Sequence, residues 1–441
     1  MKASALSIDI TPPVGLPIGG NVRADNKSRG VHDNLFCNII LLEDKRETVC
    51  FLSFDLLGLH FDSCRLIKSQ ISTKTGLNQK NIVISATHTH SGPDVLEFFK
   101  EEIDSECVSY IKNIAEKVAD GVRQAFEQLQ DMQMRISKKA VDDLSFNRRL
   151  IMKSGSVKMN WEYPDEKYVL KEAGPIDHDL FVIALSDTQC SVKALLLNFT
   201  LHPAVLVGQD WLWSRDFINY LDEYLKRHLG DNVVVFFTNG AEGNINHIDY
   251  RNRNQGRGFK EAERIGEKLG KYVLEALDCS KPVEDISLAC VSSAVKLPYR
   301  KISEDDKKKA EELLIKSGGI IPSLIDGCPD EIYAQQIMKM SKRTELFAVT
   351  EIQTIRLAEN IVITTMPGEV FVEFGLKIKG ISECENTLVF GLTNDCIGYV
   401  PTRAAFRQGG YEIRTATSSQ LDELAGEMLI NEMKRLLAML Y

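Results

Sequence analysis

The sequence predicts an α/β fold, a layered domain with mixed β-sheets flanked by helices and a metal site at strand ends. Apolar runs of strand length alternate with segments of helical apolar spacing along most of the 441 residues. The chain is 44% hydrophobic and 26% charged, a composition typical of soluble globular proteins. It contains no internal repeat and no Pro- or Ser-rich linker, which favours one large domain over residues 1–441.

Short apolar runs, rich in β-branched and aromatic residues, predict the strands. They span residues 36–42, 49–56, 81–86, 132–140, 180–186, 194–199 and 233–237. Two further runs with alternating polarity, 350–357 and 361–366, are joined by Ala-Glu-Asn and predict a hairpin.

Apolar residues spaced three and four apart predict helices over 108–126 and 262–276, whose apolar faces we expect to pack in the core. Residues 62–75 and 421–441 are further predicted helices. Residues 304–316, rich in lysine and glutamate, predict a surface helix. This helix belongs to a segment, about 303–345, that we expect to be a family-variable helical insertion.

The charge balance and the cysteines restrict the class of protein. A net charge of −9 argues against nucleic acid as the main partner, because phosphate binding requires a basic face. No segment approaches the ~18 apolar residues of a membrane span, and no signal peptide is visible. The ten cysteines are scattered. Cys37, Cys50, Cys190 and Cys290 lie in apolar runs, and we expect these four to be reduced and buried. We expect a cytoplasmic protein, or alternatively an exported one whose signal peptide is absent from this chain.

The most informative motif is Ser-Ala-Thr-His-Thr-His-Ser-Gly-Pro at residues 85–93. His88 and His90 follow a predicted strand at positions i and i+2, which in a strand point to the same face. Neutral imidazole is a good ligand for zinc and similar metals, so the pair is a candidate metal site. From these nine residues alone, two polar residues at a strand end are an equally good interpretation.

Other polar residues also interrupt or follow apolar strands. His202 ends one such strand just before a proline, and Glu369 follows another at a Pro-Gly turn. If residues 371–378 form a helix, Glu369 lies in its first turn, either as a simple helix-terminal charge or as a metal carboxylate or general base. A glycine-rich loop at 239–247 follows a buried strand, and Tyr399 and Tyr411 flank a predicted loop and short helix. The loop has neither a nucleotide-binding spacing nor a serine-hydrolase Gly-x-Ser-x-Gly motif.

Together these segments resemble the neutral/alkaline (non-lysosomal) ceramidase family in its zinc-dependent catalytic domain. The resemblance runs through nearly the whole chain in order. It includes Ile8-Asp9-Ile10-Thr11-Pro12, Gly30-Val31-His32-Asp33, Phe54-Asp55-Leu56, residues 86–93, Asn147-Arg148, residues 198–203, residues 239–246, Pro367-Gly368-Glu369 and residues 399–412. The chain resembles a short form without the C-terminal immunoglobulin-like domain of the long members.

The resemblance implies one zinc ion per chain and a role for each matching residue. His88, His202, Glu369 and Tyr399 match the zinc ligands. His90 matches a catalytic histidine beside the metal, while Arg148 and Tyr411 match polar groups around the substrate carbonyl. The chemistry implied is amide hydrolysis by attack of metal-bound hydroxide, with stabilisation of the oxyanion and transfer of a proton to the leaving amine.

The chain departs from the family at the central loop, where Asn244 stands at the position of a serine. A serine nucleophile is therefore not available there. The leading prediction is a zinc-dependent amidohydrolase that cleaves a ceramide-like or more polar N-acyl bond of a small-molecule or lipid substrate. A metal-dependent esterase or phosphodiesterase is the alternative, and a non-catalytic binding relative is a third. The oligomeric state is left open.

Overall fold

Three β-sheets pack around a common core in the computed structural model, which describes residues 1–22, 26–99, 102–206, 210–318 and 328–440. The first sheet has the strand order β5-β4-β3-β1-β6. Its strands are β1 (Lys2–Asp9), β3 (Phe36–Glu43), β4 (Thr48–Phe54), β5 (Ile82–Ala86) and β6 (Gln130–Asp131).

The second sheet has the order β15-β13-β12-β7-β17 and the third has the order β18-β19-β20-β22. Their strands are β7 (Gln133–Ala140), β12 (Asp179–Ser186), β13 (Val192–Phe199), β15 (Val234–Asn239), β17 (Lys281–Pro282), β18 (Ile286–Pro298), β19 (Phe347–Ala358), β20 (Ile361–Thr365) and β22 (Asn386–Phe390). Smaller sheets are formed by β2 (Gly30–Val31) with β14 (Leu212–Trp213), β8 (Phe146–Asn147) with β16 (Ile245–Asn246), β21 (Glu369–Val370) with β23 (Tyr399–Val400), and by β9 (Arg149–Met152), β10 (Val157–Met159) and β11 (Val169–Glu172).

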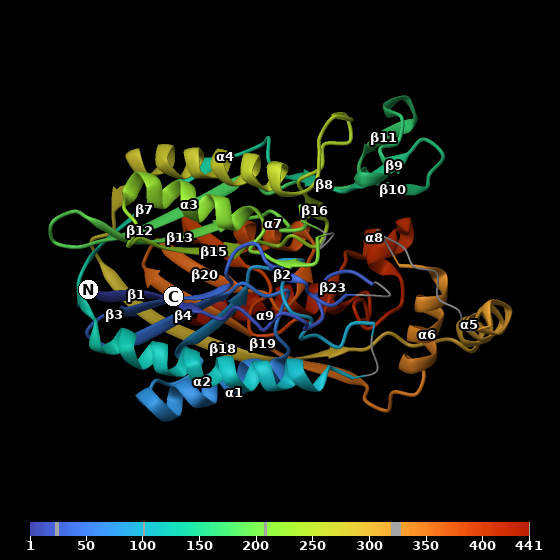
Figure 1. The fold of residues 1–441 in the computed structure, drawn as a ribbon, viewed down its shortest axis with the longest axis horizontal. Helices are drawn as coiled ribbons and strands as arrows, with labels where there is room; N and C mark the ends of the chain where they lie inside the picture. Colours follow the sequence, from blue (N-terminus) through green and yellow to red (C-terminus); the bar gives the residue numbers. More distant parts are fainter. Residues whose placement is uncertain (23–25, 100–101, 207–209, 319–327, 441) are drawn as a thin grey trace.

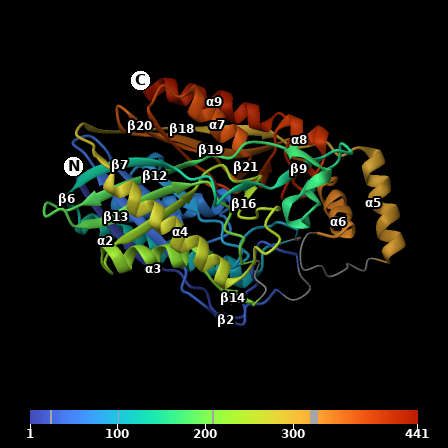
Figure 2. The same cartoon turned by 90° about the horizontal axis from the view of Figure 1, so that it is seen from above.

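Each large sheet is covered on its outer face by a pair of helices. Helices α1 (Phe61–Thr75) and α2 (Ser105–Glu127) cover the first sheet, and α3 (Phe217–Leu229) and α4 (Phe259–Asp278) cover the second (Figure 1). Helices α7 (Val372–Ile381) and α9 (Ala425–Leu440) cover the third (Figure 2). Side chains alternate across each strand, so one set packs under the helices while the other fills the shared core. Phe51, Phe236 and Leu388, one from each sheet, meet in that core.

The predicted α/β class, strands and principal helices are confirmed. The predicted hairpin is formed by β19 and β20, which pair antiparallel. The segment expected to be an insertion contains α5 (Glu304–Ser317) and α6 (Asp330–Met340), while the short helix between the two tyrosines is α8 (Arg403–Gln408). Residues 319–327 of the insertion and Tyr441 of the predicted last helix lie outside the described residues. Within the described ranges, no helix combines the length and the apolar character needed to cross a membrane.

Two expectations about particular residues are wrong. Cys190 is exposed, not buried, because it lies in a tight turn with a positive φ of 63°. Glu369 does not lie in the first turn of a helix. It is part of β21, and α7 begins only after Phe371.

A buried cluster of charges fixes the chain just before the first histidine motif. The Nε atom of Arg215 lies 2.8 Å from a carboxylate oxygen of Asp55, and its Nη1 donates to Asp222 at 3.0 Å. Asp55 in turn accepts a hydrogen bond from the hydroxyl of Thr87 at 3.3 Å. Arg215 and Asp55 are both almost fully buried, so the ion pair is shielded from water.

We predict that Arg215→Met destabilises the fold by about 3–5 kcal/mol, because it leaves buried carboxylates without their cation. Urea unfolding followed by circular dichroism measures this change. The matched control is Arg227→Met, since Arg227 pairs with Glu267 on an exposed face and should cost at most about 1 kcal/mol. Equal losses in the two variants would contradict the structural role of Arg215.

Candidate metal centre and active site

The predicted site residues come together because each large sheet contains one pair of parallel strands. These pairs are β4 with β5, β13 with β15, and β20 with β22. The chain segments that leave the carboxyl ends of these strands meet at one place, the usual position of ligand sites in α/β folds. Hydrogen bonds join the segments directly. The side chain of Asn239 donates to the Thr87 carbonyl at 2.8 Å, and the Gly391 amide donates to the Asn239 carbonyl at 2.9 Å.

His88 is held in one orientation by the backbone. Its amide donates to the Leu56 carbonyl at 2.9 Å, and its Nδ1 lies 2.5 Å from the Leu57 carbonyl oxygen. A carbonyl only accepts, so Nδ1 carries the proton and Nε2 presents a lone pair when the ring is neutral. Nε2 lies 3.5 Å from Oε2 of Glu369.

The two histidines of the motif converge for a different reason from the one that the sequence suggests. β5 ends at Ala86, so neither histidine lies in a strand. His88 has a φ of 70°, which turns the backbone sharply between the two residues. The His90 amide then donates to the Pro203 carbonyl at 3.2 Å, which ties this turn to the segment that carries His202.

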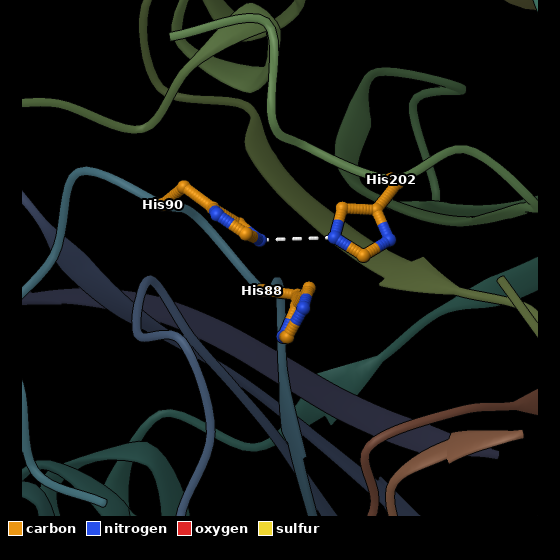
Figure 3. Close-up of side chains that lie close together, drawn as sticks. All are labelled: His88, His90 and His202. Atoms are coloured by element: carbon orange, nitrogen blue, oxygen red, sulfur yellow. Dashed lines mark hydrogen bonds between the residues drawn. The ribbon is translucent and has the colours of Figure 1, made fainter. Parts of the chain in front are cut away.

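His88, His90 and His202 form a cluster of imidazoles (Figure 3). One ring nitrogen from each lies within 4.8 Å of the others. The Nε2 atoms of His90 and His202 are 2.9 Å apart, and the His88 and His202 ring centres are 4.5 Å apart. Burial lowers the pKa of His202 well below its usual value, so its ring is neutral.

Glu369 and Tyr399 enter the site from the small parallel sheet of β21 and β23, where they are direct partners. Glu369 is almost fully buried, and its Oε2 accepts no hydrogen bond from the described residues. The hydroxyl of Tyr399 lies 3.1 Å from that of Tyr411, which brings the second predicted tyrosine to the same place.

Arg148 is held beside these tyrosines by a buried carboxylate. Its Nε donates to Glu412 at 3.1 Å and its Nη2 donates to the Gly243 carbonyl at 2.6 Å. Its guanidinium carbon lies 5.0 Å from the ring centre of Tyr411. Glu412 also pairs with Arg149 at 2.5 Å, so two arginines balance its charge. This leaves Nη1 of Arg148 without a hydrogen-bond partner in the described part of the chain.

All seven predicted site residues line one cavity of about 520 Å³. They are His88, His90, Arg148, His202, Glu369, Tyr399 and Tyr411. The volume lies within the ~300–1,000 Å³ range of small-molecule sites. Apolar side chains, among them Leu57, Phe98, Met159 and Trp161, share the lining with polar ones. The sequence therefore predicts the location of the site, while the role of each residue stays a prediction.

Glu242 is a buried acidic residue to which the sequence reasoning assigned no role. Its side chain is fully buried and neither carboxylate oxygen has a hydrogen-bond partner among the described residues. Burial raises its pKa to about 8, although the nearby His88 opposes the shift. One feature of the sequence could have pointed to Glu242: it is a carboxylate in a loop of glycines and apolar residues that follows a buried strand.

Asn244, at the position of the family serine, does not line the cavity. Its side-chain oxygen accepts from the Val372 amide at 2.8 Å and its nitrogen donates to Glu373 at 2.9 Å. Asn244 therefore holds the first turn of α7, directly after the strand that carries Glu369. This placement gives the residue a structural role, not a nucleophilic one.

The donor set fits a zinc ion. Two buried imidazoles and a buried carboxylate provide the nitrogen and oxygen ligands that zinc prefers. Glu369 next to His88, with an unpaired oxygen, is the kind of buried acceptor that a cation satisfies. Glu369 outweighs the effect of burial and raises the pKa of His88, so this pair already favours a positive charge between its members.

We predict that Gly20→Ala lowers the rate of the reaction catalysed in this cavity, because it displaces His90, and that it leaves the predicted zinc ligands in place. A Cβ atom at Gly20 would lie 2.5 Å from Nδ1 of His90, so the imidazole must move. The matched control is Gly15→Ala, because Gly15 also has a positive φ but a Cβ there meets nothing within 4 Å. Steady-state kinetics should show at least a tenfold larger loss for Gly20→Ala, since misplaced catalytic groups cost up to ~100-fold. Equal activity in the two variants would show that the position of His90 next to Gly20 does not matter for the reaction.

Comparison with known proteins identifies relatives of the chain. A family model described as neutral/alkaline non-lysosomal ceramidase, N-terminal, matches residues 5–239. The neutral ceramidases of Drosophila melanogaster and Drosophila pseudoobscura pseudoobscura are each 27% identical over 149 residues. These alignments cover 32% of this chain and 21% of each relative, so the match spans about a fifth of their length.

Solved structures share the fold over the full chain. Neutral ceramidase from Pseudomonas aeruginosa gives a TM-score of 0.75 at 16% identity, covering 100% of this chain and 74% of that one. A ceramidase complexed with C2 gives a TM-score of 0.74 at 16% identity, covering 100% and 75%. Because the family model matches more than half of the 441 residues, the chain belongs to the neutral/alkaline non-lysosomal ceramidase family.

Proposed function

We propose that this protein is a zinc-dependent amidohydrolase that cleaves an N-acyl bond and releases an amine and a carboxylate. The observation that carries the proposal is the convergence of His88, His202 and Glu369 on one cavity. His88 and His202 follow strands of the first and second sheets, and Glu369 lies in the small sheet of β21 and β23. Family membership supports amide hydrolysis as the reaction. Tyr399 is proposed as the fourth ligand because it is the register partner of Glu369.

Zinc, when bound, supplies Lewis acidity and makes water a stronger acid near neutral pH. The residues of the chain supply the remaining chemistry. Nε2 of His90 accepts a proton from the attacking water and delivers it to the nitrogen of the leaving amine. Nη1 of Arg148 and the hydroxyl of Tyr411 donate hydrogen bonds to the carbonyl oxygen as negative charge develops on it. Glu412 positions Arg148 for this role.

The substrate is proposed to be ceramide-like or a more polar N-acyl compound. Apolar side chains such as Phe98, Phe99 and Trp161 can pack against a hydrocarbon chain, and polar side chains share the same cavity.

We further propose that residues 1–441 act as one catalytic domain. The match covers 74% of the Pseudomonas protein's own chain, so that protein has further sequence outside the matched region.

Metal removal and restoration test the proposal. The protein treated with a chelator should lose hydrolysis of an N-acyl amine, and one equivalent of zinc per chain should restore it. Matched amide and ester substrates with the same acyl chain distinguish an amidohydrolase from an esterase. Hydrolysis of the ester alone, or full amide hydrolysis by the metal-free protein, would contradict the proposal.

A further inference from the structure

His247 lines the same cavity but has no part in the proposed chemistry. Its side chain is 2% exposed, and neither Nδ1 nor Nε2 has a hydrogen-bond partner in the described part of the chain. Burying a polar group without a partner is costly, by about 1–3 kcal/mol. A ligand in the cavity is the natural means of satisfying it.

The backbone around His247 is fixed relative to the proposed catalytic arginine. His247 follows β16, which pairs with β8, and β8 ends immediately before Arg148. The side chain of Gln255 donates to the His247 carbonyl at 2.7 Å and holds the loop after β16 in place. The backbone of His247 is therefore tied by hydrogen bonds to the strand that leads directly into Arg148.

Three other polar residues that line the cavity, Asn246, Glu162 and Arg414, are bonded to neighbouring groups. Asn246 exchanges two hydrogen bonds with Asn160, at 2.7 and 2.8 Å. The carboxylate of Glu162 accepts from the Met159 amide at 2.9 Å, and Arg414 pairs with Asp330 at 2.6 Å. His247 differs from these three residues because neither of its ring nitrogens has a hydrogen-bond partner among the described residues.

The charge state of His247 indicates the chemical class of its ligand. Burial lowers the pKa of His247 to about 3, so the ring is neutral and offers one donor and one acceptor. A hydroxyl group also donates and accepts, and it can pair with either tautomer. A carboxylate only accepts, so it could use the donor of the neutral ring but not its acceptor. Acidic and basic side chains, such as Glu162 and Arg257, both line the cavity.

We propose that His247 is a specificity-determining residue that hydrogen-bonds a hydroxyl group of the substrate. This inference rests on the proposed amide hydrolysis at the same site. It assigns His247 to recognition and not to the reaction. Hydroxylated N-acyl amines should therefore be preferred over their deoxy analogues.

A substrate series tests the assignment. N-octanoyl butylamine is the reference, and its analogues carry one hydroxyl at successive positions of the amine chain or of the acyl chain. A further analogue carries a terminal carboxylate. In the wild type, at least one hydroxylated analogue should exceed the reference about five- to tenfold in kcat/KM.

His247→Phe should abolish this preference while keeping hydrolysis of the reference compound. His247→Gln, which keeps one donor and one acceptor, should retain part of it. His228→Phe is the control, because His228 is exposed on α3 and should leave all the ratios unchanged. A wild type without hydroxyl preference, or an undiminished preference in His247→Phe, would overturn the inference. So would a preference for the carboxylate that depends on His247.

Binding measurements separate this inference from the proposed function. Isothermal titration calorimetry of the same compounds with the metal-free protein needs no turnover. If no amide is hydrolysed but hydroxylated compounds bind tighter and His247→Phe removes the difference, the inference holds and the proposed function fails. If amides are hydrolysed and bound without regard to the hydroxyl, the inference alone fails.

Discussion

Replacing His88 or His202 with alanine is expected to remove both the bound zinc and the amidase activity. Each change deletes one buried imidazole from a cluster in which the ring nitrogens lie within 4.8 Å of one another. Each imidazole would supply one bond to the metal, and its removal would leave a ligand set with a single imidazole, which would hold zinc more weakly. The loss of a charge-stabilising metal is worth several kcal/mol, so the rate should fall at least ~1,000-fold.

The measurements are zinc stoichiometry by elemental analysis and kcat/KM for an N-acyl amine. His228→Ala provides a matched control, since this histidine lies on the exposed face of α3 and should keep one zinc per chain. Circular dichroism checks that each variant is folded. A folded His88→Ala or His202→Ala protein that still holds one zinc would show that the ligand assignment is wrong.

The location of the site is predictable from the sequence because its chemistry-bearing residues occur where buried strands end. His88, His202 and the loop at 239–247 each follow an apolar run that forms a strand. Carboxyl ends of parallel strands collect ligands in α/β proteins. The sequence alone does not reveal that these strands belong to two different sheets, or that β13 pairs with β15, because the two paired segments lie about forty residues apart.

The local geometry is less predictable because it depends on tertiary contacts. The i, i+2 spacing of His88 and His90 suggests a strand, yet the structure bends the chain at His88 after the strand has ended. Glu369 reads as a helix-terminal charge until its pairing with Tyr399 is known. The sequence also does not show that the side chains of Glu242 and His247 lack hydrogen-bond partners among the described residues, because this depends on how distant segments pack around them.

His90→Ala is expected to keep the zinc and lose the rate. The structure brings Nε2 of His90 within 2.9 Å of His202, so His90 could act either as a further ligand or as a proton carrier. In the proposed assignment His88, His202, Glu369 and Tyr399 are the four ligands, which leaves His90 for proton transfer. Removing a general acid–base group lowers kcat by about 10²–10⁴-fold.

The leaving group distinguishes proton transfer from a structural effect. An N-acyl alkylamine needs a proton on its nitrogen before the bond breaks, whereas an N-acyl nitroanilide leaves with less help because its amine is far less basic. His90→Ala should therefore slow the alkylamide much more than the nitroanilide, with one zinc per chain retained in elemental analysis. Equal losses on both substrates would contradict proton delivery by His90. Loss of zinc, as in His88→Ala, would instead identify His90 as a ligand and exclude the proposed division between the two histidines.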